Sequence, residues 1–291
     1  MNKRISTVYK RELKALFCSP VGWLFIALNL ITVGVCIAIL NIKGGYISYE
    51  YSLEAASLAF CLTVPLLSTL SLSREGKRTE TDILLRYTSS GELTVGKFLA
   101  WITVFSAPVS VSACLPPLLG MWGKIYYPAA YMGVAGYALS GLALLALGMY
   151  IASAIRRPWL CFAVTALSVI LLNVAANLAR ITAEYNTVAF VICAVVLLAL
   201  ITVALFFYLE NTLVAIIFAA VGSVTAVVLT LTDFLAPVMR ETLEFISPQH
   251  AQYSLIYGTA ALEGIVQPLM FCAVFLILTV LRFENRRRKE N

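Results

Sequence analysis

Charged side chains are scarce in this sequence. Asp, Glu, Lys and Arg together make up 12% of its 291 residues, and hydrophobic residues make up 61%. Soluble globular domains contain about 25% charged residues. A soluble domain with the present composition would have almost no polar shell around its core, whereas a polytopic membrane protein has lipid as its solvent. The composition therefore predicts an integral membrane protein.

Histidine is represented by His250 alone, and the seven cysteines form no CxxC pair. One histidine in a loop supplies neither a metal-ligand cluster nor a Ser/His/Asp arrangement. We therefore predict no catalytic residue, no metal site and no bound cofactor, and we predict that the chain is not an enzyme. The cysteines fall mostly inside apolar runs, which is typical of small buried side chains and not of a disulfide framework.

Carboxylates are absent from the middle of the apolar runs. Ion- and proton-coupled carriers usually place ionisable groups inside the membrane, so this absence disfavours a secondary transporter. The polar residues in the middle of the runs are amides such as Asn29 and Asn173, which leave a Na⁺ site open. The net charge of +6 comes from basic residues next to these runs, which makes nucleic acid a poor partner.

Eight apolar runs are present, and a helix needs about 20 apolar residues to cross a hydrocarbon core. They cover approximately residues 21–40, 54–73, 98–121, 129–155, 159–178, 188–209, 212–232 and 262–281. The sixth and seventh are separated only by Glu210 and Asn211, so they form either a helical hairpin or one long helix. The sequence thus predicts an all-α, polytopic membrane bundle of about eight transmembrane helices.

Proline is expected to distort two of these runs. Pro65 lies in the second, and Pro108, Pro116 and Pro117 lie in the third. Proline removes a helical hydrogen bond, and membrane helices tolerate it where neighbouring groups bind the freed carbonyls. We expect a kink at Pro65 and a bend or break toward the end of the third run.

The first 20 residues are basic and amphipathic. Ile5, Val8 and Leu16 fall near one face of a predicted helix over residues 3–17, and Lys and Arg dominate the remainder. Such a helix lies on an anionic membrane surface. Ser19-Pro20 is expected to end this interfacial helix before the first span.

Lys and Arg are distributed unevenly between the two ends of the predicted spans. Of the 21 basic residues, 17 lie in the N-terminal helix, the segment 74–97, the turn at 156–157 and the C-terminal tail, and 4 lie in the other loops. The positive-inside rule then places both termini and the segment 74–97 in the cytoplasm, and the segment 233–261 outside.

The segment 74–97 carries nine of the charged residues and separates two apolar runs. Thr79 and Asp82 have the spacing of a capping box, which predicts a short helix ending at Ser89–Gly91. Its apolar side would consist of Ile83, Leu84, Leu85 and Tyr87. A charged helix with one apolar side suits a groove on a cytoplasmic partner, and the alternative is a helix that rests on lipid.

Residues 91–97 match the first seven positions of a phosphate-binding loop, GxxxxGK. The eighth position is Phe98, where the loop needs a Ser or Thr that binds Mg²⁺. No strand precedes the match, and an apolar run follows it. We therefore predict that any ATP used by this protein is bound by a different chain.

From Leu66 to Ala100 the sequence resembles the ABC-2 type permeases, the membrane subunits of ABC exporters. The family pattern is matched at Glu75, Lys77, Arg78, Thr79, Thr81, Asp82, Leu84, Leu85, Ser90, Gly96, Lys97 and Phe98. The departures are Gly76, Glu80 and Gly91. The stretch from Tyr9 to Pro20 and the end from Ser247-Pro248 to Arg286 are similar to the gliding-motility permease subgroup.

This resemblance implies one ABC-2 type transmembrane domain over residues 1–291, built from a six-helix family core and a hairpin. It implies a plasma (inner) membrane exporter whose partners are a cytosolic ABC ATPase, a second permease copy or paralogue, and membrane lipid. The residues predicted to couple to the ATPase are Glu75, Lys77, Arg78, Thr79, Glu80, Thr81, Asp82, Ile83, Leu84, Leu85, Tyr87, Ser90, Gly96 and Lys97. The alternatives are a membrane-embedded enzyme acting on lipid and a non-transporting scaffold or sensor.

Overall fold

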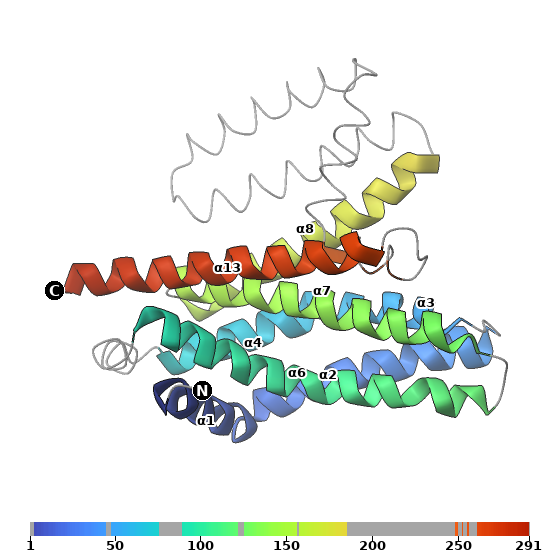
Figure 1. Ribbon diagram of the computed structural model, residues 1–291, viewed down its shortest axis with the longest axis horizontal. Helices are drawn as coiled ribbons and strands as arrows, with labels where there is room; N and C mark the ends of the chain where they lie inside the picture. The colour runs from blue at the N-terminus through green and yellow to red at the C-terminus, as the bar shows by residue number, and fades with distance from the viewer. Residues whose placement is uncertain are drawn as a thin grey trace, which may run out of the picture. The chain divides into compact units, whose positions relative to one another are not determined.

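The computed structural model describes residues 3–44, 48–75, 89–121, 125–155, 157–184, 248–249, 252, 255 and 261–290. Within these ranges the regular secondary structure is helical and includes no strand, which confirms the predicted all-α class (Figure 1). The chain divides into two compact units, one formed by Met1–Ala166 with Ala251–Asn291 and the other by Leu167–His250.

The first unit is built from long helices. They are α1 (Lys3–Phe17), α2 (Pro20–Cys36), α3 (Tyr49–Ala56), α4 (Phe60–Glu75), α6 (Ser90–Gly120), α7 (Tyr127–Ala154) and α13 (Ala261–Glu290). Helix α2 continues as π-helical turns over Ile37–Lys43, and a 3₁₀ turn at Ser57–Ala59 joins α3 to α4. Helix α8 (Pro158–Glu184) begins in the first unit and continues into the second.

Five helices of the described part of the chain are long and apolar enough to cross a membrane. They are Pro20–Lys43, Tyr49–Leu70, Ser90–Gly120, Tyr127–Ala154 and Gly264–Asn285. These coincide with five of the predicted runs, and the shorter apolar stretch Pro158–Val174 of α8 coincides with a sixth. The predicted runs 188–209 and 212–232, and most of the segment 233–261, lie outside the described residues.

The corner between α1 and α2 forms where Ser19-Pro20 predicts it. Ser19 is the N-cap of α2, its side chain accepts a hydrogen bond from the Val21 amide at 3.3 Å, and Pro20 occupies the first helical position. Gly22 lies so close to the Leu16 carbonyl that a Cβ there would collide with it. A glycine at this position therefore allows α1 to fold back sharply against the start of α2.

Proline does not break α6, so of the predicted bend or break the break is wrong. The helix runs from Ser90 to Gly120 through Pro108, Pro116 and Pro117. Pro116 has no amide hydrogen, so it cannot satisfy the carbonyl of Ser112 four residues earlier. The hydroxyl of Tyr49 on α3 donates to that carbonyl at 2.8 Å. A neighbouring helix thus replaces the lost bond, which is how membrane helices tolerate proline.

The second span is irregular at a place that the sequence analysis did not predict. The 3₁₀ turn at Ser57–Ala59 interrupts it before Pro65 is reached, and α4 continues through Pro65. The hydroxyl of Ser57 donates to the Glu54 carbonyl at 2.6 Å, which satisfies one backbone group beside the turn. The deviation from α-helix therefore lies at the junction of α3 and α4.

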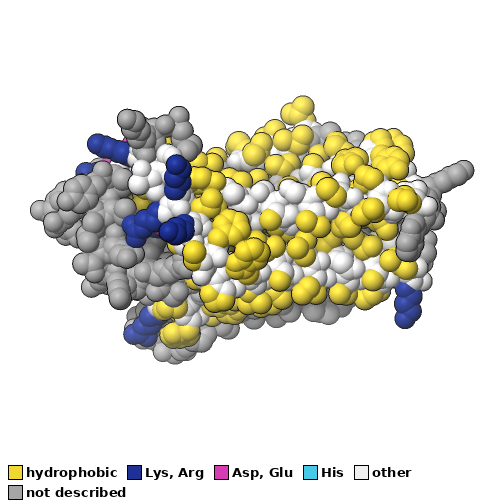
Figure 2. Space-filling model, turned by 90° about the horizontal axis from the view of Figure 1, so that it is seen from below, with side chains coloured by type: hydrophobic (Ala, Val, Ile, Leu, Met, Phe, Trp, Pro, Cys, Tyr) yellow, Lys and Arg dark blue, Asp and Glu magenta, His cyan; other side chains and the backbone are white. Residues whose placement is uncertain are grey.

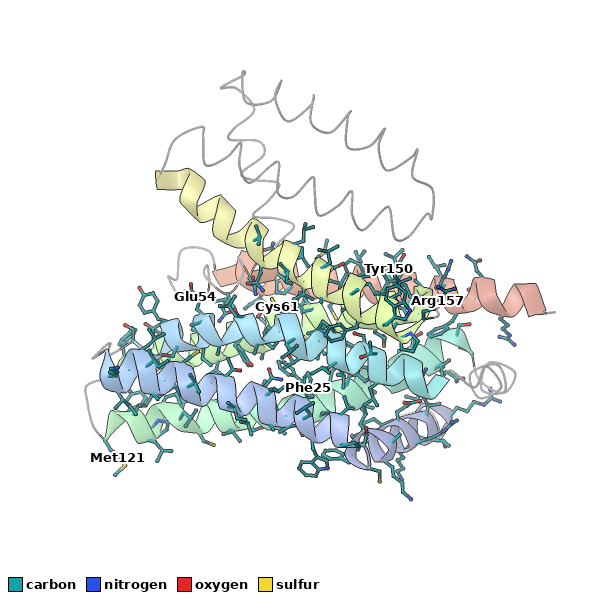
Figure 3. The ribbon with its side chains drawn as sticks, turned by 180° about the vertical axis from the view of Figure 1, so that it is seen from behind. Phe25, Glu54, Cys61, Met121, Tyr150 and Arg157 are labelled. Atoms are coloured by element: carbon teal, nitrogen blue, oxygen red, sulfur yellow. The ribbon has the colours of Figure 1, made fainter. Side chains whose placement is uncertain are left out.

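Four aromatic rings form the centre of the first unit. Phe25, Phe60, Phe105 and Tyr137 come from α2, α4, α6 and α7, and each ring centroid lies 4.8 to 6.4 Å from that of at least one of the others. Figure 3 shows Phe25 pointing from α2 toward its neighbours. A Cβ at Gly141 would collide with Phe105, so a residue without a side chain lets α7 approach the rings. Such contacts hold helices together where lipid provides no hydrophobic drive.

The two ends of this bundle differ in charge. At the basal end, α2 and α6 begin, and α4, α7 and α13 end; the apical end is the opposite one (Figure 1). Figure 2 shows Lys and Arg side chains gathered around the basal end, next to a broad apolar surface. Arg157 lies at the basal end and Met121 at the apical end (Figure 3).

Candidate functional site

The site begins at the N-terminus of α6, where the charged segment joins the bundle. The Glu92 amide donates to the Ser89 side chain at 3.4 Å, and the Ser89 amide donates to the Glu92 carboxylate at 3.1 Å. These reciprocal bonds form a capping box, so Ser89 starts α6. The sequence analysis expected Ser89–Gly91 to end a preceding helix. Ser90 and Gly91 instead form part of the first turn of α6, and the predicted preceding helix itself lies outside the described residues.

The stretch that resembles a phosphate-binding loop is helical. Gly91 to Lys97 form the first two turns of α6. A phosphate-binding loop needs successive backbone amides that point at one anion, and in a helix beyond its first turn these amides bond to carbonyls instead. Gly96 and Lys97 therefore have another role in the structure, which their contacts define.

Helix α1 packs on the first turns of α6 and the last turns of α13. Val8, Leu93 and Phe283, one from each helix, form a buried apolar cluster. Gly96 lies directly under Val8, and a Cβ there would be 2.8 Å from Val8 Cγ1. We call Val8, Leu93, Gly96, Lys97 and Phe283 the basal cluster.

Lys97 is the charged member of the basal cluster. Its side chain is only 3% exposed, and its ammonium nitrogen lies 5.7 Å from the centroid of the Phe283 ring. A buried charge is costly unless other groups stabilise it, and an aromatic face attracts a cation by about 0.5–2 kcal/mol. Lys97 thus links the base of α6 to the end of α13, and its aliphatic stem is buried in the same place.

A polar contact secures α1 further along α6. The Tyr9 hydroxyl lies 3.1 Å from the Thr103 hydroxyl oxygen, and Thr103 donates to the Leu99 carbonyl at 2.9 Å. Because the Thr103 hydrogen is used in this way, Tyr9 is the donor to Thr103. Together with Val8 at Gly96, this bond fixes α1 to α6 over about two turns.

Two apolar residues of α1, Val8 and Leu16, are buried in the protein, while Phe17 on the same helix stays exposed. Val8 and Leu16 are each 3% exposed, and Val8 packs on Leu93 and Phe283. The helix itself spans Lys3–Phe17, as predicted from its spacing. The amphipathic pattern was interpreted correctly as a helix, and one of its apolar residues, Val8, packs against the neighbouring helices α6 and α13.

The predicted coupling residues fall into two groups. Glu75 is the last residue of α4, while Ser90, Gly96 and Lys97 lie in the first two turns of α6. The remaining ten lie outside the described residues; they are Lys77, Arg78, Thr79, Glu80, Thr81, Asp82, Ile83, Leu84, Leu85 and Tyr87. Sequence reasoning missed Leu93 and Phe283, and the capping signal Ser89-x-x-Glu92 would have located the helix start that positions Leu93.

Neither metal-binding groups nor similar proteins assign a function to this site. Among the described residues, no group of three or more His, Cys, Asp or Glu side chains is placed to hold a metal ion. No protein-family model, no curated protein and no solved structure matches the chain. The basal cluster is therefore the candidate site on geometric grounds.

Proposed function

We propose that this chain is the membrane-spanning permease subunit of an ATP-driven ABC exporter of the ABC-2 type. The observation that carries the proposal is the geometry of the basal end. Helix α4 ends there and α6 begins there, so the two described ends of the charged segment both lie at the basal end. Any force on that segment reaches α6 directly, and through Val8 and Lys97 it reaches α1 and α13.

We propose that the basal end faces the cytoplasm. The described basic residues of α1, together with Arg157, Arg282 and Arg287, belong to segments at this end. Cytoplasmic loops of membrane proteins carry an excess of Lys and Arg. With eight spans, including the two proposed between residues 188 and 232, both termini lie on this side of the plasma (inner) membrane.

We propose that a separate cytosolic ABC ATPase docks on the segment 74–97. The charged residues around Thr79–Asp82 flank Ile83, Leu84 and Leu85, which would enter a groove of the ATPase. ATP-driven closure of two ATPase subunits would then push on the bases of α4 and α6 in a dimer of permease chains. The substrate would leave between the two membrane halves, and the chain itself would hydrolyse no ATP.

Leu84→Asp tests this proposal. Burying a leucine contributes roughly 1.5–3 kcal/mol, and an unpaired charge in an apolar contact costs several kcal/mol. The variant should insert normally into the membrane and lose co-purification with its partner ABC ATPase. Lys43→Asp, which introduces a carboxylate at the exposed apical end, is the matched control and should retain the ATPase.

Two results separate the alternatives. A helix that only rests on lipid predicts that Leu84→Asp weakens membrane contact and leaves the ATPase bound. Normal insertion together with undiminished co-purification and transport would show that Leu84 does not contact the ATPase. If no P-loop ATPase binds the wild-type chain at all, the exporter assignment fails and a scaffold or lipid-acting enzyme becomes the better hypothesis.

A further inference from the structure

The outward face of α1 is basic and ends in an exposed aromatic pair. Lys10, Lys14 and Phe17 follow one another at helical spacings of four and three residues, and all three are exposed. Residues at these spacings share one face of a helix. Trp23, at the start of α2, continues this face across the corner, so we call these four residues the Lys10–Trp23 corner.

The aromatic pair is held in a defined geometry. The rings of Phe17 and Trp23 meet edge to face, with centroids 5.9 Å apart and planes at 68°. The Trp23 indole nitrogen donates to the Phe17 carbonyl at 2.9 Å, which fixes the ring against the end of α1. Trp23 nevertheless remains 58% exposed and Phe17 remains 37% exposed. A fixed and exposed aromatic pair offers a surface without a large entropic cost on binding.

The opposite side of α1 is already occupied. Val8 and Leu16 are buried, and Tyr9 bonds to Thr103 on α6. The packing of the bundle therefore accounts for the inner face and leaves the side chains of Lys10, Lys14, Phe17 and Trp23 exposed. The position of the Lys10–Trp23 corner is also specific, because Trp23 lies in the first turn of Pro20–Lys43, a helix long and apolar enough to cross a membrane.

We propose that the Lys10–Trp23 corner binds an anionic phospholipid of the leaflet at the basal end. The ammonium groups of Lys10 and Lys14 match the charge of the phosphate, and the rings of Phe17 and Trp23 match the glycerol region below it. Aromatic side chains with an apolar body and a polar edge sit at this depth of the bilayer. The proposal rests on membrane insertion alone and is independent of transport or of an ATPase.

The apolar surface beyond Trp23 favours a lipid over a soluble phosphate compound or an acidic protein segment. Trp23, Ala27 and Ile31 recur at four-residue spacing along the exposed face of α2, and Ile31 is 60% exposed. This stripe leads away from the basic residues toward the middle of the span, as an acyl chain would. A soluble anion would contact the basic residues but not the apolar stripe of Trp23, Ala27 and Ile31.

Lipid titration of the purified full chain in detergent micelles, read by native mass spectrometry, tests the proposal. The probes are short-chain phosphatidylglycerol and phosphatidylcholine of the same acyl length. Each basic residue near an anionic surface contributes about fivefold in affinity, so two predict a preference of roughly 25-fold for phosphatidylglycerol. Lys10→Gln with Lys14→Gln should abolish the preference for phosphatidylglycerol. Trp23→Ala should weaken the binding of both lipids to the same extent.

Arg282→Gln with Arg287→Gln is the matched control, because it removes two exposed basic residues from the same end at a different helix. It should keep the preference for phosphatidylglycerol. The proposal is overturned if the wild type binds the two lipids equally, if the control loses the preference as well, or if inorganic phosphate displaces phosphatidylglycerol. Equal melting temperatures without added lipid show that the variants are folded.

Discussion

The hydroxyl of Tyr49 donates a hydrogen bond at 2.8 Å to the carbonyl of Ser112, which Pro116 leaves without a helical donor. The two bonded residues are 63 positions apart in the sequence and belong to α3 and α6. Ser112 is fully buried, so water cannot replace this donor. One long-range bond therefore compensates for the amide that Pro116, one of the three prolines inside α6, does not provide.

Tyr49→Phe should destabilise the protein because it leaves a buried carbonyl without a donor. The expected loss in the free energy of unfolding is about 1–2 kcal/mol. Pro116→Ala restores an amide hydrogen four residues after Ser112, so Tyr49→Phe should cost less in that background. The measurement is denaturant unfolding of the purified protein in detergent micelles.

Tyr131→Phe is the matched control for this double-mutant cycle. Tyr131 lies on α7 with a side chain that is 45% exposed, so removal of its hydroxyl should change stability by less than about 0.5 kcal/mol. An equal cost of Tyr49→Phe with and without Pro116 would show that the bond does not compensate for the proline.

Gly96→Ala should push α1 away from the base of α6. A Cβ at this position would lie 2.8 Å from Val8 Cγ1, and overpacking of this kind costs about 1–3 kcal/mol. Gly34→Ala is the control, since nothing lies within 4 Å of a Cβ there and alanine favours the helix. Val8→Ala should reduce the cost of Gly96→Ala. If Gly96→Ala and Gly34→Ala have the same stability, the close approach of α1 to α6 does not contribute to the stability of the protein.

Sequence reasoning located the five spans of the described residues well because their signal is local. A run of about 20 apolar residues defines a membrane helix without reference to the rest of the chain. The same holds for the corner at Ser19-Pro20, whose capping residues are adjacent. The α-helix over residues 3–17 was also predictable, because amphipathic spacing depends only on neighbouring turns.

The parts that were missed depend on contacts between distant residues. No local pattern shows that Tyr49 would replace the bond lost at Pro116, or that Phe283 would lie on Lys97. The surface that α1 covers was missed for the same reason, because lipid and a neighbouring helix favour the same apolar face. The capping box at Ser89 is different, because its signal was local. It was missed because Ser89 had been assigned to the end of the preceding helix.

Labelling of single cysteines should show which end of the bundle faces the cytoplasm. In a background without the seven native cysteines, Met121→Cys places a thiol at the apical end, where the side chain is 78% exposed. Arg157→Cys places an exposed thiol at the basal end. A membrane-impermeant maleimide added to intact cells should modify position 121 and spare position 157, and both should react after permeabilisation. The opposite pattern would invert the proposed topology.

Removing the charge of Lys97 should uncouple α6 from α13. Phe283→Leu should cost about 0.5–2 kcal/mol more in the wild type than in a Lys97→Met background, since methionine keeps the buried stem but has no cation for the ring. Phe271→Leu, on the same helix, should have the same cost in both backgrounds. Denaturant unfolding in micelles measures all of these differences.

The same variants connect the basal cluster to the proposed transmission of force. Replacing a buried charge by an apolar residue of similar volume is often neutral for stability, so Lys97→Met should fold and bind the ATPase. Its stimulation of ATP turnover in the reconstituted complex should fall, because the base of α6 can then move without α13. Lys97→Arg keeps a cation over the Phe283 ring and should retain stimulation. If Lys97→Met stimulates ATP turnover as strongly as the wild type does, the contact between Lys97 and Phe283 is structural only.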